Sequence, residues 1–184
     1  AQFADVIVLA RELNMLQVKE ISDIIARDQI KGPAGELVQI EMFCHGALCM
    51  AISGKCYLSL HEYGSSANRG SCFQICRRGY EVTDLETGAQ LHVDNKYIMS
   101  PKDLCTIEFI DKMINAGVSV LKIEGRARSA EYVKTVTASY RKGVDAVLNG
   151  TFTPEYAAGL KKDLETVFNR GFWDGYYQGA RLGQ

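Results

Sequence analysis

Residues 5–44 read DVIVLARELNMLQVKEISDIIARDQIKGPAGELVQIEMFC, and this stretch decides the fold class. It opens at 5–10 with an almost wholly apolar run, which is typical of a parallel strand buried on both faces. Apolar residues then recur at helical spacing over 16–26, behind Asn14 as a helix N-cap. A break that contains glycine and proline leads into a second strand at 37–44. This order of strand, helix and strand predicts one unit of an α/β fold.

Beyond the second strand the pattern changes before regular order returns. Glycine, serine and cysteine dominate 45–78, without a sustained strand or helix period. Residues 80–83 and 90–93 then predict a β-hairpin. The remaining predicted elements are a helix that starts at Ser100-Pro101 and ends near 116, a strand at 118–123, a helix behind Ser129, a helix from Pro154 to about 168, and an aromatic, glycine-rich tail at 172–184.

Strands and helices therefore alternate, which places the chain in the α/β class. The predicted parallel strands are too few to close a (β/α) barrel, which takes about eight. We expect the C-terminal part of a TIM-like (β/α) barrel over 1–148, with a cysteine-rich insertion and small β-hairpin at 45–99. A C-terminal helix and aromatic tail at 149–184 would pack on the barrel. A small three-layer α/β domain is the alternative.

The composition narrows the class of protein. The chain has 184 residues, of which 47% are hydrophobic, enough for one globular domain with its own core. Its 21 Lys and Arg nearly balance 22 Asp and Glu, which excludes a disordered tail and a strongly basic arm. No apolar run approaches the roughly 18–20 residues of a membrane span. Ala1 is followed by no basic and apolar leader, so we expect no secretory signal and a cytoplasmic protein.

The six cysteines are the strongest chemical signal in the chain. Their clustering, in a chain with long amphipathic helices, favours a metal or iron–sulfur site over a disulfide framework. From Cys49 the spacing is C-x6-C-x15-C-x3-C, and four thiolates on glycine-rich turns suit a [4Fe–4S] cluster or a tetrahedral zinc ion. Buried structural thiols and a nucleophilic cysteine are the alternatives. Cys44 is expected to be a packed thiol, whereas Cys105 fits either role.

Residues 41–59 carry a specific pattern, E-x-F-x-x-G-A-L-C-x4-G-x-C-x-L-S. The pattern resembles the signature of the peptidase U32 family, the collagenase-like proteases. Further pieces in matching order extend the resemblance over nearly the whole chain. The resemblance implies that the N-terminal half of the family's barrel is missing here or is supplied by a partner chain. These pieces are Arg11–Leu13, Asn68–Arg77, Ser100–Leu104, Lys122–Arg126 and Phe168–Phe172.

The resemblance implies a divided function. The family's name says protease, whereas its better understood members hold a [4Fe–4S] cluster on four cysteines. Those members hydroxylate tRNA, 23S ribosomal RNA or a ubiquinone precursor without molecular oxygen, and the RNA-modifying ones draw on prephenate. Carried over by position, the residues that hold the metal cofactor would be Cys49, Cys56, Cys72 and Cys76.

Three side chains near the predicted strand ends are candidate catalytic residues, because barrels place their chemistry there. Glu41 is either an acid/base group or half of a structural ion pair with Lys122. His45 is either a proton relay near the cysteines or a satisfied structural histidine. Arg126 suits a carboxylate or phosphate, unless it pairs with a glutamate. The candidate substrate-binding residues are Arg69, Lys122, Glu124, Arg126 and Arg128.

A local basic patch beside the cysteines contains Lys55, Arg69, Arg77 and Arg78. It suits an RNA backbone, and a solvated loop face is the alternative. We therefore expect a [4Fe–4S]-dependent RNA hydroxylase with a prephenate-like anion as co-substrate. A collagenase-like peptidase is the alternative, although the sequence shows no HExxH motif, no GxSxG elbow and no evident Ser/His/Asp set. A non-catalytic domain stabilised by zinc is a third possibility.

Overall fold

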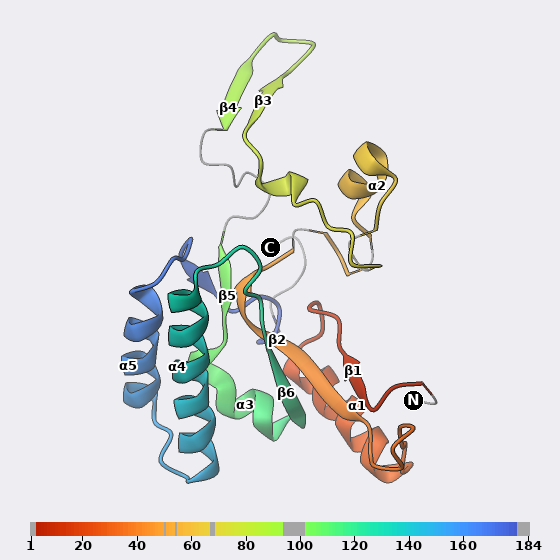
Figure 1. The fold of residues 1–184 in the computed structure, drawn as a ribbon, viewed down its shortest axis with the longest axis vertical. Coiled ribbons are helices and arrows are strands. Elements are labelled where there is room, and N and C mark those ends of the chain that lie inside the picture. Colours follow the sequence, from red (N-terminus) through yellow and green to blue (C-terminus); the bar gives the residue numbers. More distant parts are fainter. Residues whose placement is uncertain (1–2, 50, 54, 67–68, 94–101, 180–184) are drawn as a thin grey trace. The chain divides into compact units, whose positions relative to one another are not determined.

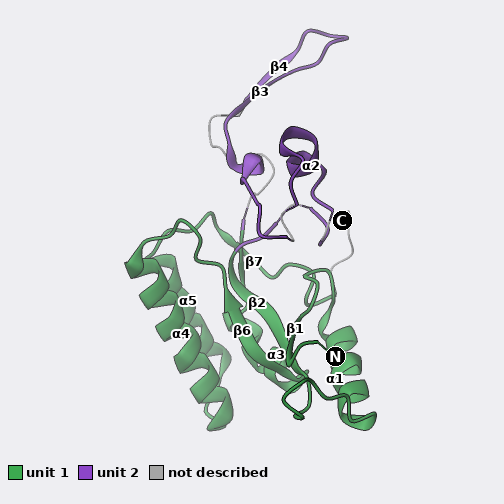
Figure 2. Cartoon of the chain, turned by 45° about the vertical axis from the view of Figure 1, so that its right-hand side comes forward, with its two compact units in different colours: residues 1–46, 103–184 green, residues 47–102 purple. Residues whose placement is uncertain are grey.

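The computed structural model describes residues 3–49, 51–53, 55–66, 69–93 and 102–179. The chain divides into two compact units, one formed by residues 1–46 and 103–184 and the other by residues 47–102 (Figure 2). The first unit contains the larger sheet and the long helices, and the second contains four of the six cysteines. Each unit is described by itself.

A sheet of five strands forms the centre of the first unit (Figure 1). Strand β2 (Gln39–Ala47) pairs in parallel with β1 (Val6–Val8) and with β6 (Val118–Ile123). Strand β5 (Asp103–Cys105) neighbours β2 and pairs in parallel with β7 (Phe172–Trp173). The predicted α/β class with parallel strands is confirmed. Five strands among the described residues are too few for an eight-stranded barrel, so the barrel remains a prediction.

One predicted helix start is wrong. The sequence predicted a helix from Ser100, which lies outside the described residues, but Asp103–Cys105 forms strand β5 with all three residues buried. Helical structure begins only with a 3-10 turn at Ile107–Phe109, which continues as α3 (Ile110–Asn115). The carboxylate of Asp103 caps no helix, because it is buried and forms ion pairs with arginines.

The other helix starts follow their sequence signals. Helix α1 (Met15–Arg27) begins with a capping box in which Asn14 and the third helical residue exchange hydrogen bonds of 3.0 Å. Helix α4 (Ala130–Leu148) begins behind Ser129, whose hydroxyl accepts a backbone N–H. Helix α5 (Pro154–Glu165) has proline in its first turn and lies beside α4 (Figure 1).

The core of the first unit is mainly apolar. Each of these helices presents only part of its surface to the core, so α4 alternates buried and exposed positions. Across the described parts of the chain, we find no helix with the length and hydropathy needed to cross a membrane. The largest fully buried side chains include Val18, Ile40, Met42, Leu104, Ile107, Ile110, Met113, Val136 and Leu164.

The C-terminal segment is tied to three other elements of the first unit. Its strand β7 pairs with β5. The hydroxyl of Tyr177 donates to the carbonyl oxygen of Phe43 in β2 at 2.9 Å. The backbone N–H of Met15, at the start of α1, donates to the carbonyl oxygen of Tyr177, also at 2.9 Å. The segment therefore closes the unit by long-range contacts, although it contains little regular structure.

The second unit contains short elements. Helix α2 (Tyr57–Tyr63) is followed by a 3-10 turn at Ile75–Arg77. The predicted hairpin is present as β3 (Tyr80–Thr83) and β4 (Gln90–Val93), paired in antiparallel fashion. Its turn is held by the side chain of Asp84, which accepts two backbone N–H groups at 2.9 Å.

Candidate functional site

Four cysteines of the second unit are in no disulfide, and each is partly exposed. Cys49 follows β2, Cys56 precedes α2, Cys72 lies in a loop and Cys76 lies in the 3-10 turn. Burial is the main cause that raises the pKa of the Cys76 thiol, and the charge of Arg77 opposes that rise. The other three thiols each raise the pKa of Cys76 further. These effects on the Cys76 thiol indicate that the other three thiols lie within electrostatic reach of it.

The surroundings of Arg77 favour a negatively charged group near the four thiols. Its Nη1 donates to Oε1 of Gln74 at 3.1 Å, but its buried Nε–H has no hydrogen-bond partner among the described residues. Leaving a buried donor unpaired costs about 1–3 kcal/mol, so an anionic group beside Arg77 would be stabilised.

The four thiols fit a metal group by their donor chemistry. Thiolates are the ligands of iron–sulfur clusters and of structural zinc, and a guanidinium beside them offsets their charge. Within the described ranges, no three or more histidine, cysteine, aspartate or glutamate side chains already stand at metal-binding positions. The fit therefore rests on the kind, number and proximity of the donors.

The other two cysteines are packed thiols of the first unit. Burial is the main cause that raises the pKa of Cys44, and burial likewise raises the pKa of Cys105 to about 11. The Cys44 thiol donates to the carbonyl oxygen of Lys122 at 3.4 Å, and the hydroxyl of Tyr140 lies 4.0 Å from Sγ of Cys105. Both thiols are protonated at neutral pH and are poor nucleophiles.

Two cations flank one aromatic ring at the sheet of the first unit. The Nζ of Lys122 lies 2.5 Å from Oε1 of Glu41 and 5.4 Å from the ring centre of Phe43. The guanidinium carbon of Arg11, which follows β1, lies 5.1 Å from the same ring centre. Glu41 therefore has the ion-pair partner that the sequence suggested. Arg11 is a candidate that the sequence interpretation missed, although its position just after a strand was a usable signal.

His45 is buried among aromatic rings. Its Nδ1 lies 3.3 Å from the hydroxyl of Tyr140, and its ring packs against those of Tyr132 and Phe172. Burial lowers the pKa of His45 to about 4, although the charge of Asp103 opposes this effect. The imidazole is therefore neutral at physiological pH. This environment favours the structural role over the proton relay.

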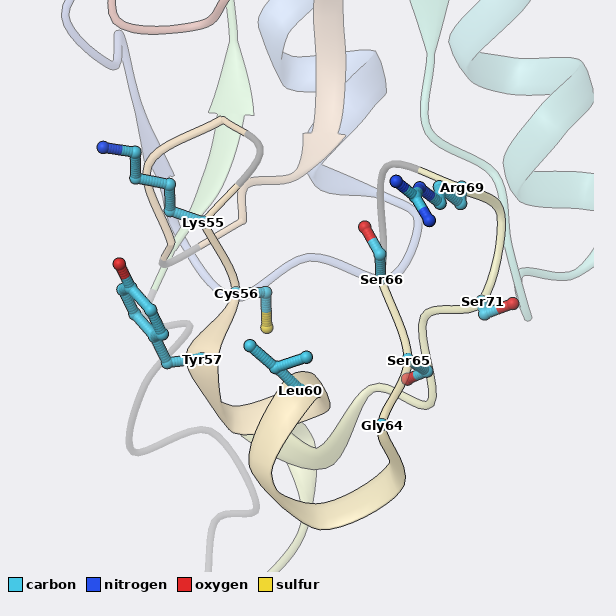
Figure 3. A pocket seen from close by; sticks show the side chains of 9 residues that line it. All are labelled: Lys55, Cys56, Tyr57, Leu60, Gly64, Ser65, Ser66, Arg69 and Ser71. Carbon is cyan, nitrogen blue, oxygen red and sulfur yellow. The ribbon is translucent and has the colours of Figure 1, made fainter.

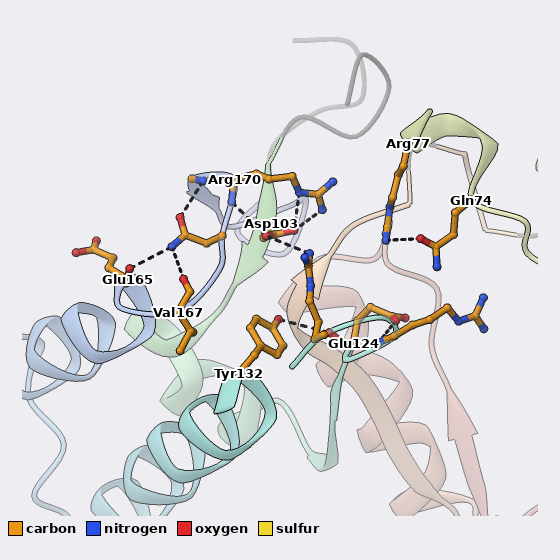
Figure 4. Close-up of polar contacts among 12 residues, drawn as sticks. Gln74, Arg77, Asp103, Glu124, Tyr132, Glu165, Val167 and Arg170 are labelled. Carbon is orange, nitrogen blue, oxygen red and sulfur yellow. Dashed lines mark hydrogen bonds and ion pairs between the residues drawn. The ribbon is translucent and has the colours of Figure 1, made fainter. Parts of the chain in front are cut away.

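Asp103 is the centre of a buried charge cluster that the sequence interpretation missed (Figure 4). Its carboxylate accepts hydrogen bonds from the backbone N–H of Arg170 at 3.3 Å and from Nε of the same residue at 3.1 Å. The Nη2 of Arg128 lies 3.8 Å from the carboxylate, and the Arg128 guanidinium lies 4.1 Å from the ring centre of Phe168. Arg128, a predicted substrate-binding residue, thus has an internal partner.

Glu124 and Arg126 lie in the turn that follows β6. The Oε1 of Glu124 accepts the backbone N–H of Arg126, and the backbone N–H of Glu124 donates to the carbonyl oxygen of His45, both at 2.9 Å. Gly46 packs against this turn with a φ of +106°, and a Cβ there would lie 2.5 Å from the Glu124 carbonyl oxygen. Glycine is therefore required for this close approach. The Arg126 side chain is exposed.

Arg69, the remaining predicted substrate-binding residue, lines a pocket of about 540 Å³ within the second unit (Figure 3). Among the described residues, the lining includes two cations and one of the four cysteines of this unit but no carboxylate. The lining residues are Lys55, Cys56, Tyr57, Leu60, Gly64, Ser65, Ser66, Arg69 and Ser71.

A parallel α/β unit joined to a unit with four clustered thiols describes an α/β protein with a candidate metal centre. Comparison with known proteins gives the family: the family model for peptidase family U32 matches residues 1–183. The chain therefore belongs to peptidase family U32, and the resemblance seen in the sequence is confirmed.

The relatives carry two kinds of name. A collagenase of Porphyromonas gingivalis is 63% identical over 100% of this chain and 44% of its own length. A tRNA hydroxylation protein of Bacillus subtilis is 43% identical over 91% of this chain and 40% of its own length. A 23S rRNA 5-hydroxycytidine synthase of Escherichia coli is 39% identical over 96% of this chain and 26% of its own length. The chain thus spans less than half of these relatives. No solved structure matches it.

Proposed function

We propose that this chain is part of an oxygen-independent RNA hydroxylase that holds a [4Fe–4S] cluster on Cys49, Cys56, Cys72 and Cys76. The observation that carries the proposal is the electrostatic proximity of these four thiols, none of which is in a disulfide, together with the Arg77 Nε–H, which has no hydrogen-bond partner in the described part of the chain. The relatives named for hydroxylation of tRNA and 23S rRNA match over most of the chain, which supports RNA as the substrate. A cytoplasmic location is part of the same proposal.

The reaction explains why a redox group is needed. Replacing a C–H bond of a base with C–OH removes two electrons from the RNA. Without molecular oxygen, another oxidant must accept these electrons, and water or another compound must supply the oxygen atom. When bound, a cluster supplies electron transfer or Lewis-acid chemistry. Arg77 would hold positive charge beside the thiolates and so stabilise their ionised form.

The first unit offers groups for an anionic co-substrate such as prephenate. Lys122 and Arg11 present positive charge around Phe43, and 42% of the Lys122 side chain is exposed. Arg126 lies exposed after β6. In parallel α/β folds the carboxyl ends of the strands are where ligands bind. These cations would bind and orient a carboxylate, while Glu41 keeps the Lys122 ammonium in place.

A peptidase is the second candidate, and the 63% identity to a protein named collagenase favours it. The described residues provide little of the machinery that such an activity needs. His45 is buried with a pKa of about 4, and its polar partner is a tyrosine. In the described parts of the chain, no serine or cysteine side chain makes a hydrogen bond to a histidine. The hydroxylase is therefore the better supported function.

The deciding experiment is anaerobic purification of the full-length protein, followed by iron, sulfide and zinc analysis. We expect about four iron and four sulfide per chain, lost in Cys49→Ala and Cys72→Ala. Cys105→Ala, a buried thiol of the first unit, is the matched control and should keep its iron. Deletion of the gene should then remove a hydroxylated nucleotide from tRNA or ribosomal RNA, measured by mass spectrometry.

Two outcomes would overturn the proposal. Stoichiometric zinc without sulfide would point to a structural zinc domain. Absence of iron from the complete, anaerobically prepared protein, together with gelatin cleavage that a single substitution abolishes, would point to the peptidase.

A further inference from the structure

The pocket of the second unit carries positive charge that its own surroundings do not neutralise. Residues 49–78 contain four Lys or Arg side chains and a single acidic residue, Glu62. Glu62 is exposed and its carboxylate lies 3.2 Å from Nδ1 of His61. Lys55 and Arg69 both line the pocket, and none of the described residues in its wall carries a carboxylate. The pocket is therefore suited to an anionic ligand.

The two walls of the pocket differ in character (Figure 3). One wall belongs to α2 and the residue before it, where the thiol of Cys56 and the side chain of Leu60 point into the space between the walls. The other wall is formed by residues 64–66, 69 and 71, which include the Ser66 hydroxyl and the Arg69 guanidinium. One side thus offers apolar contact and the other offers hydrogen-bond donors.

The turn that forms the donor wall is fixed by its own hydrogen bonds. The hydroxyl of Ser65 donates to the carbonyl oxygen of Ser59 at 3.3 Å. The backbone N–H groups of Arg69 and Ser71 both donate to the carbonyl oxygen of Ser66, at 3.0 and 3.2 Å. These bonds hold the backbone of the turn, so the donor wall is preorganised for a ligand.

A stacked aromatic pair continues from the pocket along α2. The rings of Tyr63 and Phe73 lie 4.7 Å apart and nearly parallel, and they are 43% and 52% exposed. The guanidinium carbon of Arg78 lies 5.4 Å from the ring centre of Tyr63. Tyr63 directly precedes Gly64, which lines the pocket. An exposed aromatic pair beside cations is the arrangement that binds unpaired bases of single-stranded RNA.

We propose that the pocket binds a backbone phosphate of single-stranded RNA through Arg69, Lys55 and Ser66, while a neighbouring base stacks on the Tyr63–Phe73 pair. A pocket of about 540 Å³ is large enough for a nucleotide. The inference rests on the proposed function, because it takes RNA as the substrate. It adds RNA binding to the role of the cysteine-rich unit, because Cys56 is both a proposed cluster ligand and part of the pocket wall.

The test measures binding of a fluorescently labelled single-stranded RNA oligonucleotide to the full-length, cluster-loaded protein over a range of salt concentrations. Each phosphate contact contributes about 0.7 to the slope of log affinity against log salt for single strands. Arg69→Gln and Lys55→Gln should each weaken binding about three- to tenfold near physiological salt and make that slope shallower by about 0.7. Phe73→Ala should weaken binding about fivefold or more with an unchanged slope.

Arg141→Gln is the matched control, because it removes the same charge from an exposed helix position in the first unit. Equal weakening by Arg69→Gln and Arg141→Gln would overturn the pocket, since net charge alone would explain binding. Unchanged RNA affinity in both pocket variants, with inorganic phosphate binding lost, would assign the pocket to a small free anion instead. Unchanged iron content in each variant shows that the unit is still folded.

The two proposals fail in different ways. Binding of RNA that depends on Arg69, in a protein that leaves every nucleotide unhydroxylated, would keep the pocket and overturn the hydroxylase. Loss of the hydroxylated nucleotide on gene deletion, with RNA affinity indifferent to both pocket variants, would keep the hydroxylase and overturn the pocket.

Discussion

Arg170 binds the carboxylate of Asp103 through its backbone N–H and two guanidinium nitrogens, although the two residues lie 67 positions apart. Both side chains are almost fully buried, with 5% and 1% exposed. The pair links the segment before β7 to strand β5, which β7 joins in the sheet. It is therefore an internal contact between distant parts of the chain, unlike an ion pair on the surface.

Replacing Arg170 with methionine should destabilise the protein strongly, because the buried Asp103 carboxylate would keep only the backbone N–H of residue 170 and the more distant Arg128 guanidinium beside it. We expect the free energy of unfolding in urea to fall by about 3–5 kcal/mol. Arg141→Gln, which breaks an exposed pair on α4, should change it by less than about 0.5 kcal/mol. Similar losses in the two variants would show that Asp103 is not a buried anchor.

The hydroxyl of Tyr140 joins two strands from the inside. It donates to the carbonyl oxygen of Cys44 at 2.7 Å and accepts the backbone N–H of Thr106 at 2.9 Å. Tyr140→Phe would remove this link, while the backbone N–H of Thr106 keeps its direct hydrogen bond to the Cys44 carbonyl oxygen at 3.1 Å, so the loss of unfolding free energy should be about 0.5–1.5 kcal/mol. Tyr156→Phe, at an exposed position of α5, is the control and should be near neutral. A neutral Tyr140→Phe would mean that the strands hold together without the link.

Stability should depend on pH through His45. Its pKa is lowered from 6.5 to about 4 in the folded protein, so the unfolded state binds a proton first as the pH falls. Above pH 6.5 neither state carries that proton, and the effect vanishes. As the pH falls from about 6.5 to 4, the free energy of unfolding should therefore decrease by up to roughly 3 kcal/mol.

The variant His45→Gln isolates this effect from other titrating groups. Urea unfolding at several pH values should show a shallower dependence in the variant than in the parent protein. Because glutamine can itself change stability, the comparison concerns slopes and not absolute values. The same pH dependence of the unfolding free energy in both proteins would show that the pKa of His45 does not change on folding.

The two classes of cysteine should differ in reactivity. In the metal-free protein, iodoacetamide should modify the partly exposed Cys49, Cys56 and Cys72 well before the buried Cys44 and Cys105. The raised pKa of Cys105, about 11, slows its reaction further. Peptide mapping by mass spectrometry after a short exposure would measure the order. Early modification of Cys105 would contradict its packing in the core.

The charge of Arg77 should raise the reduction potential of a bound cluster. Its positive charge stabilises the more negative, reduced form, so Arg77→Gln should lower the reduction potential. Potentiometric titration of the anaerobic protein would measure the shift, and Arg78→Gln, one residue further along, is the control. An unchanged potential in Arg77→Gln, with iron content intact, would show that the unpaired Nε–H serves another purpose.

The features that were predictable from the sequence depend on neighbouring residues. The N-caps Asn14 and Ser129 and the first-turn Pro154 act within one helical turn, so the sequence alone shows them. The hairpin over 80–93 likewise follows from its own residues. The spacing of the cysteines predicts that four of them act together, and this stays a prediction.

The features that were missed depend on distant partners. Asp103 has the sequence context of a helix start. In the folded chain it is a buried strand residue, because its carboxylate pairs with Arg170 and Arg128 from distant parts of the sequence. The two-residue strand β7 exists because β5 lies beside it. Arg11 approaches Phe43 only after β1 and β2 pair in register. The barrel stays a prediction, because the described residues contribute five strands to this sheet and a barrel needs about eight.

The bonds made by Tyr177 have a practical consequence for anyone who shortens this chain. Glu165, where α5 ends, looks like a convenient place to stop, since the residues after it form little regular structure. A product that ended there would lack the partner of β5, the arginine beside Asp103 and the hydrogen bonds to Phe43 and Met15. We expect cellular proteases to remove such a product, so a nonsense mutation in this stretch would behave as a null allele.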